Sequence, residues 1–156
     1  MEIHDLVETV IFRPNHLDLP DSWIGHIPFA NWLTRNIKPN IFVELGTQSG
    51  NSYFSFCQTV SSSRLSTKCY AVDTWKGDGY TGPYGEDVFE KVFNYHQKNY
   101  DTFSYLLRMT FDEALDYFTD ESIELLHIDG YHTYEAVKHD FNSWLPKCKA
   151  NAFILL

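Results

Sequence analysis

The stretch FVELGTQSG, Phe42–Gly50, decides how this chain folds. It begins as an apolar run typical of a buried strand and ends in a turn that contains glycine. Between the two lies Glu44, whose carboxylate is costly to bury unless something pairs with it. The stretch therefore predicts a strand that leads through a glycine turn into a helix, and it raises the question of what Glu44 binds.

Four more apolar runs follow the first one, and segments with helical periodicity separate them. The predicted strands are Ile41–Leu45, Cys69–Asp73, Tyr105–Met109, Ile123–Asp129 and Ala152–Leu156. Nearly continuous apolar strands that alternate with helices indicate a parallel sheet covered on both faces. We therefore predict an α/β fold, a doubly wound Rossmann-like three-layer sandwich. Because an amphipathic helix over Phe29–Ile37 precedes the first strand, we expect residues 1–40 to form a helical cap segment on a domain of residues 41–156.

Size and charge narrow the classes of function. The chain has 156 residues, of which 44% are hydrophobic, as expected for one globular domain. Its net charge is -9 and its 12 basic residues are scattered, which disfavours a nucleic acid or an anionic membrane as a partner. No apolar run approaches the roughly 20 residues of a membrane helix, and the acidic start MEIHDLVETV does not resemble a secretion signal. We therefore expect a cytoplasmic protein.

Acidic residues end the first two predicted strands, where ligands of this fold bind. Glu44, Gly46 and Gly50 form the pattern E-x-G-x-x-x-G, whereas a nicotinamide site would show G-x-G-x-x-G with its acid about 20 residues later. A carboxylate at this place favours a cationic ligand over a pyrophosphate. Asp73, at the end of the second strand, is placed to accept hydrogen bonds from both hydroxyls of a ribose. S-adenosylmethionine combines such a cation with a nucleoside.

Six stretches in order along the chain carry a family resemblance. They are WIGHIPFANWL, FVELGTQSGNSYFSFCQ, YAVDTWKGD, YGEDVFEKVFNYH, TFDEAL and LLHIDGYHTYEAVKHDFNSWLPK. Together they resemble the class I S-adenosylmethionine-dependent methyltransferases, and more closely a bacterial branch that methylates sugars or natural products on oxygen and is often found beside glycosyltransferases. The resemblance implies strand order 3-2-1-4-5 and S-adenosylmethionine as the cofactor. By the same resemblance, Glu44, Gly46 and Gly50 hold its methionine part, Asp73 its ribose, and Thr110 and Phe111 its adenine. Thr74 and Asp129 are further residues expected to bind the cofactor, and Phe111 also fits a pure packing role.

The fourth strand ends in Asp129, and His132 follows on the loop into the next helix, so both are expected to face the methyl acceptor. In one interpretation His132 is a general base that takes the proton of an acceptor hydroxyl. In a second, Asp129 binds a divalent cation such as magnesium, as in some sugar O-methyltransferases that the chain resembles. In a third, Asp129 contacts only the cofactor or backbone amides.

The predicted function is therefore S-adenosylmethionine-dependent methylation of a hydroxyl oxygen on a small molecule, such as a sugar. A non-catalytic S-adenosylmethionine-binding or assembly module is the alternative, because the family's usual hairpin after the fifth strand has no counterpart before Leu156. A nicotinamide-dependent oxidoreductase is the least favoured alternative. The fifth strand is expected to be wholly apolar and to lie at an unguarded sheet edge, which predicts either a truncated form of a longer protein or a homodimer paired through that edge.

Overall fold

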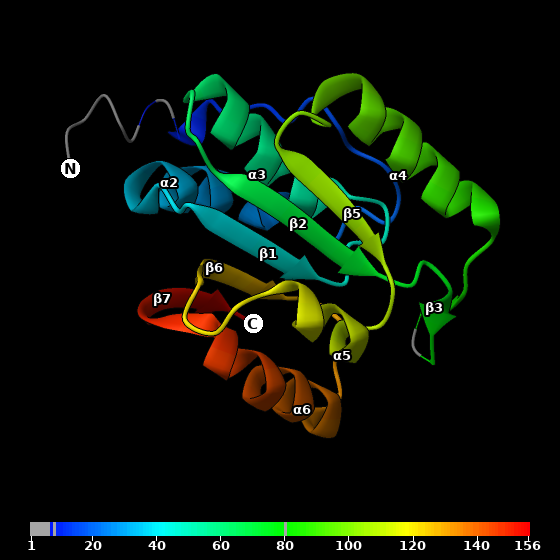
Figure 1. Cartoon of the computed structure of the whole chain (residues 1–156). Coiled ribbons are helices and arrows are strands. Elements are labelled where there is room, and N and C mark those ends of the chain that lie inside the picture. Colours follow the sequence, from blue (N-terminus) through cyan, green and yellow to red (C-terminus); the bar gives the residue numbers. More distant parts are fainter. Residues whose placement is uncertain (1–6, 8, 80) are drawn as a thin grey trace.

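The computed structural model describes residues 7, 9–79 and 81–156, and it contains a five-stranded sheet in the order β5-β2-β1-β6-β7 (Figure 1). Every neighbouring pair in this sheet is parallel. The strands are β1 Ile41–Leu45, β2 Lys68–Asp73, β5 Ser104–Arg108, β6 Ile123–Ile128 and β7 Cys148–Leu155. Numbered along the chain, this order is 3-2-1-4-5, so the predicted fold is confirmed.

Helices cover both faces of the sheet (Figure 1). One layer holds α2 Ile27–Ile37, α3 Asn51–Ser62 and α4 Glu86–Asn99, and the other holds α5 Phe111–Ala114 and α6 Tyr134–Trp144. Shorter elements are the 3-10 turns η1 Ile24–His26, η2 Leu115–Tyr117 and η3 Leu145–Lys147, and a hairpin of β3 Gly77–Asp78 and β4 Gly82–Pro83. None of the helices in these residues is long and apolar enough to cross a membrane.

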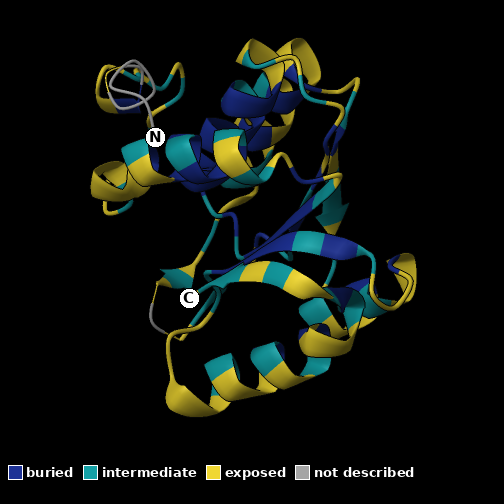
Figure 2. Cartoon of the chain, turned by 90° about the vertical axis from the view of Figure 1, so that its left-hand side faces the viewer, coloured by how far each residue is buried: buried dark blue, intermediate teal, exposed yellow. Residues whose placement is uncertain are grey.

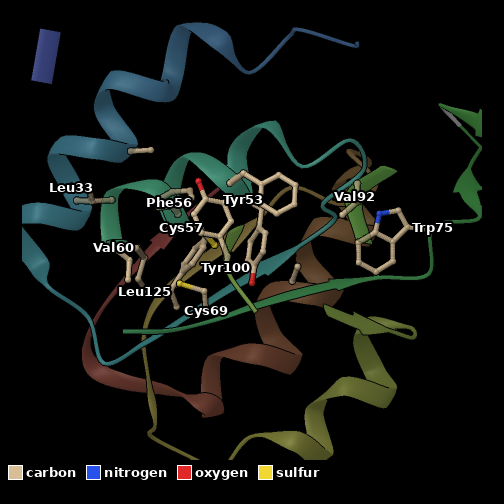
Figure 3. Close-up of a cluster of buried hydrophobic side chains, with 14 residues drawn as sticks. Leu33, Tyr53, Phe56, Cys57, Val60, Cys69, Trp75, Val92, Tyr100 and Leu125 are labelled. Atoms are coloured by element: carbon tan, nitrogen blue, oxygen red, sulfur yellow. The ribbon is translucent and has the colours of Figure 1, made fainter. Parts of the chain in front are cut away.

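Successive side chains along each strand point to opposite faces of the sheet, so the buried side chains form two clusters, one on each face. Phe42 and Leu125 face α3 together with the aromatic residues of that helix, as Figure 3 shows for Tyr53 and Phe56. Val43 faces the other layer. The central strands therefore lie buried between layers whose outward sides are exposed (Figure 2).

The helix before the first strand starts earlier than predicted, because Pro28 falls in its first turn, where proline is tolerated. The helix α2 packs against α3, and its Ala30 and Leu33 belong to the same buried cluster as Phe42 of β1. The predicted boundary at residue 40 therefore runs through one continuous hydrophobic core.

The edge strand β7 differs from the prediction at its start. It begins at Cys148 and not at Ala152, and its pairing with β6 is irregular between Ile123 and Leu125. The strand therefore includes Lys149, whose ammonium lies 2.5 Å from Glu124 of β6. The prediction of a wholly apolar fifth strand was wrong, although Phe153 is 50% exposed. Homodimer formation through this edge stays a prediction.

Candidate functional site

A cavity of about 550 Å³ lies at the carboxyl ends of the strands. It is next to β1, where the strand order reverses: β2 is the neighbour of β1 on one side and β6 on the other. Seven of the residues predicted for the site line it: Gly46, Asp73, Thr74, Thr110, Phe111, Asp129 and His132. Glu44 and Gly50 do not line it. The other walls come from the segment before η1, the loop between β1 and α3, the first turn of α3, the β3–β4 hairpin with the residue after it, and the turn after β6. These residues are Pro20, Ser22, Trp23, Thr47, Gln48, Ser49, Asn51, Ser52, Gly77, Asp78, Thr81, Tyr84, Gly130 and Tyr131.

Two glycines shape the loop between β1 and α3. Gly46 has φ +87, and a Cβ at this position would overlap the carbonyl oxygen of Asp129. Gly50 has φ +85, and a Cβ there would lie 2.5 Å from the ring of Phe54. Both positions therefore require glycine, Gly46 so that the loop can approach the end of β6 and Gly50 so that the chain can enter α3.

Asp73, at the end of β2, holds the loop between β1 and α3 in place through hydrogen bonds. Its Oδ2 accepts hydrogen bonds from the backbone amides of Thr47 and Gln48, each at 2.9 Å, and its Oδ1 accepts one from the amide of Trp75 at 2.7 Å. Since a carboxylate offers about four acceptor positions, these hydrogen bonds do not fill them all. Asp73 therefore keeps some acceptor capacity for a ligand, and its contact with both hydroxyls of a ribose stays a prediction.

Thr47 is a site residue that the sequence analysis missed. Its side chain is 3% exposed, and its hydroxyl has no hydrogen-bond partner in the described structure. Because buried hydroxyls are nearly always hydrogen-bonded, this group is the kind of atom that a bound ligand satisfies. Its place directly after Gly46, within the glycine pattern, is the sequence signal that identifies it.

Glu44 already has partners within the protein. It is 0% exposed, and it lies beside His127 in the register of the neighbouring strands β1 and β6. Its Oε2 is 2.9 Å from Nδ1 of His127, and its Oε1 accepts a hydrogen bond of 3.0 Å from the hydroxyl of Ser52. Only Ser52 of this group lines the cavity. Glu44 can therefore act on a ligand through Ser52, whereas direct contact would require the pair with His127 to open.

The environment of this pair favours its protonated forms. Burial raises the pKa of Glu44, and the hydrogen bond and positive charge of His127 only partly offset that effect. Burial alone would lower the pKa of His127, but the hydrogen bond and negative charge of Glu44 outweigh burial and raise it. The two groups therefore hold one shared proton more tightly than exposed side chains would.

The segment before η1 is fastened to the start of α3. The side chain of Asn51 accepts a hydrogen bond of 2.8 Å from the amide of Asp18 and donates to the carbonyls of Asp18 and Pro20 at 2.7 and 2.9 Å. This brings Trp23 to the cavity wall, with its ring 5.3 Å from the ring of His127. The N-terminal segment thus supplies part of the site.

Asp129 and His132 lie together at the cavity, as predicted. Nε2 of His132 is 3.3 Å from Oδ1 of Asp129, and the two side chains are 63% and 28% exposed. Among the described residues, no group of three or more His, Cys, Asp or Glu side chains is arranged to hold a metal ion. Asp129 and His132 supply two donors, so a magnesium site here stays a prediction.

Thr110 and Phe111 begin α5 at the cavity. Thr110 caps the helix: its hydroxyl accepts a hydrogen bond of 3.2 Å from the amide of Glu113, and its own amide donates to the Glu113 carboxylate at 2.9 Å. The ring of Phe111 packs against Gly130, where an added Cβ would lie 2.5 Å from it. Phe111 therefore has a packing role and also presents a cavity wall.

Comparisons with known proteins agree on the kind of domain. A family model described as a methyltransferase domain matches residues 43–156. The uncharacterised protein y4gI of Sinorhizobium fredii (strain NBRC 101917 / NGR234) is 45% identical over 150 residues, which are 96% of this chain and 16% of that protein. The chain thus spans about a sixth of the length of this relative.

Solved structures share the fold at low sequence identity. The S-adenosylhomocysteine-bound methyltransferase PaMTH1 of Podospora anserina has a TM-score of 0.65 and 13% identity, over 97% of this chain and 59% of its own. The O-methyltransferase TomG of Streptomyces achromogenes, involved in tomaymycin synthesis and solved with S-adenosylmethionine, has a TM-score of 0.62 and 13% identity, over 99% of this chain and 65% of its own. At this level of identity, these likenesses show the fold alone.

Proposed function

Because this chain belongs to the methyltransferase-domain family, we propose that its cavity binds S-adenosylmethionine and that it methylates a hydroxyl oxygen of a small molecule. The observation that carries the proposal is the unsatisfied, buried hydroxyl of Thr47 in a cavity at the switch point of the sheet. The acceptor capacity that remains on Asp73 adds a place for the ribose.

The remaining walls suit the other parts of the cofactor. Thr110 and Phe111 offer a flat, partly apolar surface for the adenine, and Ser52 connects the cavity to the buried acid Glu44. Bound S-adenosylmethionine supplies a methyl group on a sulfonium sulfur. The charge on that sulfur is favoured by the carboxylates of Asp73 and Asp129 in the same cavity.

The protein's own chemistry concerns the acceptor proton. If Nε2 of His132 carries a proton toward Asp129, Nδ1 has the lone pair that can take the proton of the acceptor hydroxyl. As the C–S bond breaks and the O–C bond forms, this proton would leave the oxygen for Nδ1, and Asp129 would stabilise the resulting imidazolium. We propose His132 as the general base on these grounds.

Calorimetry tests the binding half of the proposal. Titration with S-adenosylmethionine, S-adenosylhomocysteine and NAD should show binding of the first two only. Thr47→Val keeps the shape of the side chain and removes the hydroxyl, so the affinity for S-adenosylhomocysteine should fall by about 1 to 2 kcal/mol. Its free energy of unfolding should not fall, since the lost hydroxyl has no partner in the protein. Binding of NAD, or full affinity in this variant, would contradict the proposal.

A turnover assay tests the chemical half. His132→Ala should lower the rate of methyl transfer by about 10²-fold and leave the affinity for S-adenosylhomocysteine nearly unchanged. His139→Ala is the matched control, because His139 is also exposed and paired with an aspartate, Asp112, but does not line the cavity. Equal rates in the two variants would show that His132 is not the base.

The same measurements distinguish an active methyltransferase from the alternative function. A chain that binds S-adenosylhomocysteine but transfers no methyl group would act as a non-catalytic binding or assembly module. The chain covers 59% and 65% of the two solved methyltransferases described above, so its activity in this form is itself a proposal. A sugar as the acceptor, a setting beside glycosyltransferases and a cytoplasmic location also stay predictions.

A further inference from the structure

The charges around the cavity point to the class of acceptor. Its ionisable lining residues, apart from tyrosine, are Asp73, Asp78, Asp129 and His132. No lysine or arginine lines it in the described part of the chain, and positions 1–6, 8 and 80 contain neither residue type. A phosphate or carboxylate group that entered would therefore meet carboxylates, and no permanently cationic side chain among the lining residues.

Arg108 and Lys76 are described basic residues that lie near the cavity without lining it. Arg108 donates through both terminal nitrogens to Glu86, at 2.6 and 2.7 Å, and its guanidinium lies over the ring of Phe89 at 4.1 Å. Lys76 is exposed, and its charge helps to lower the pKa of Glu113 on α5. Arg108 is thus already neutralised by a bidentate pair, which leaves Lys76 as the cation to test.

Two of the carboxylates lie on neighbouring segments, and of these Asp78 has no part in the cofactor contacts proposed above. Asp78 is in the β3–β4 hairpin, where its Oδ1 accepts hydrogen bonds from the amide and hydroxyl of Thr81 at 2.7 and 2.9 Å. Asp129 is on the turn after β6. Tyr131 of that turn reaches the hairpin, since a Cβ at Gly79 would lie 3.4 Å from its hydroxyl. Hairpin and turn therefore form one wall.

This wall combines carboxylates with aromatic rings. Tyr84 and Tyr131 line it, and Trp23 lines the cavity from the N-terminal segment. Carboxylate oxygens accept hydrogen bonds from hydroxyl and amino groups, and aromatic faces pack against the C–H groups of a saturated ring and attract cations. Neither group favours an anion.

We infer that the acceptor is a hydroxyl-rich small molecule without phosphate or carboxylate groups, and that Asp78 and Asp129 select for it. This inference rests on the proposed function. An amino group on the acceptor would add to its affinity. Nucleotide-linked or thioester-linked acceptors with phosphates are disfavoured by the same wall.

A matched set of sugars tests this inference on the chain saturated with S-adenosylhomocysteine. We expect glucose and glucosamine to bind at least about tenfold more tightly than glucose 6-phosphate and glucuronate. The difference should shrink as salt is added, because it arises from exposed charges. Asp78→Asn keeps the oxygen that accepts from Thr81, so it should reduce the discrimination severalfold and leave the affinity for S-adenosylhomocysteine unchanged. Asp116→Asn, exposed and outside the cavity, is the control and should change neither.

Three results would overturn the inference. One is equal or tighter binding of the phosphorylated or carboxylated sugar, the second is unchanged discrimination in Asp78→Asn, and the third is phosphate binding that is lost in Lys76→Ala. Failure to bind S-adenosylhomocysteine is a different result, which would overturn the proposed function instead. The two proposals therefore fail separately.

Discussion

Replacing His127 with leucine is expected to lower the free energy of unfolding by about 3 to 5 kcal/mol, because it leaves the carboxyl group of Glu44 buried without its main partner. Ser52 alone would then donate to that group. Glu44→Gln is the matched variant, since an amide can still pair with both Ser52 and His127, and it should cost much less. Urea unfolding monitored by fluorescence measures both, and equal losses in the two variants would show that the buried pair is not important for stability.

The same pair predicts how stability depends on pH. The pKa of His127 is raised in the folded chain above its unfolded value near 6.5, so the folded chain keeps a proton that the unfolded chain releases. The stability that this proton contributes is present below about pH 6.5 and is lost as the pH rises through the folded pKa, by up to about 1.4 kcal/mol per pH unit. Glu44→Gln removes the charge that raises the pKa, so its unfolding free energy should fall less over that range. If the free energy of unfolding of the wild-type chain instead rises relative to that of Glu44→Gln over this pH range, the pKa of His127 is not raised in the folded chain.

Gly46→Ala is expected to lower the free energy of unfolding by about 3 kcal/mol or more and to abolish cofactor binding. The added methyl group would meet the carbonyl group of Asp129, which is backbone and cannot rotate away, and the residue would also keep a φ of +87. Relief of the overlap would separate β1 from the end of β6 and displace both Thr47 and Asp129 from the cavity.

Gly82→Ala is the control for backbone strain alone. Gly82 has φ +78, but a Cβ there would meet no atom within 4 Å. It should therefore cost only about 1 kcal/mol, the strain of a non-glycine residue in this conformation. Unfolding and calorimetry with S-adenosylhomocysteine measure both variants. If Gly46→Ala loses no more stability than Gly82→Ala, the close approach of the loop to β6 is not what requires glycine at position 46.

The family resemblance supplied the strand order, whereas the residues by themselves determined the layers and the edge of the sheet that carries the site. These features follow from local signals: apolar runs, helical stripes and acids at strand ends, joined by the rules of parallel α/β topology. The family resemblance added the candidate cofactor and placed Asp73, Thr110, Phe111 and Asp129, all of which line the cavity. Such residues reach one cavity because parallel strands bring their carboxyl ends to one edge whatever the side chains elsewhere.

Only the tertiary structure decided which partner each polar group has. The sequence gives Glu44 a cationic ligand, whereas the register of β1 against β6 places it beside His127, 83 residues later. The tertiary structure also shows that two backbone amides of the glycine loop and that of Trp75 donate to Asp73, and that the hydroxyl of Thr47 has no partner within the described structure. Register and loop closure depend on packing between segments distant along the chain, so no local pattern encodes them. Hydrogen bonds between such segments therefore decide which groups are left for a ligand.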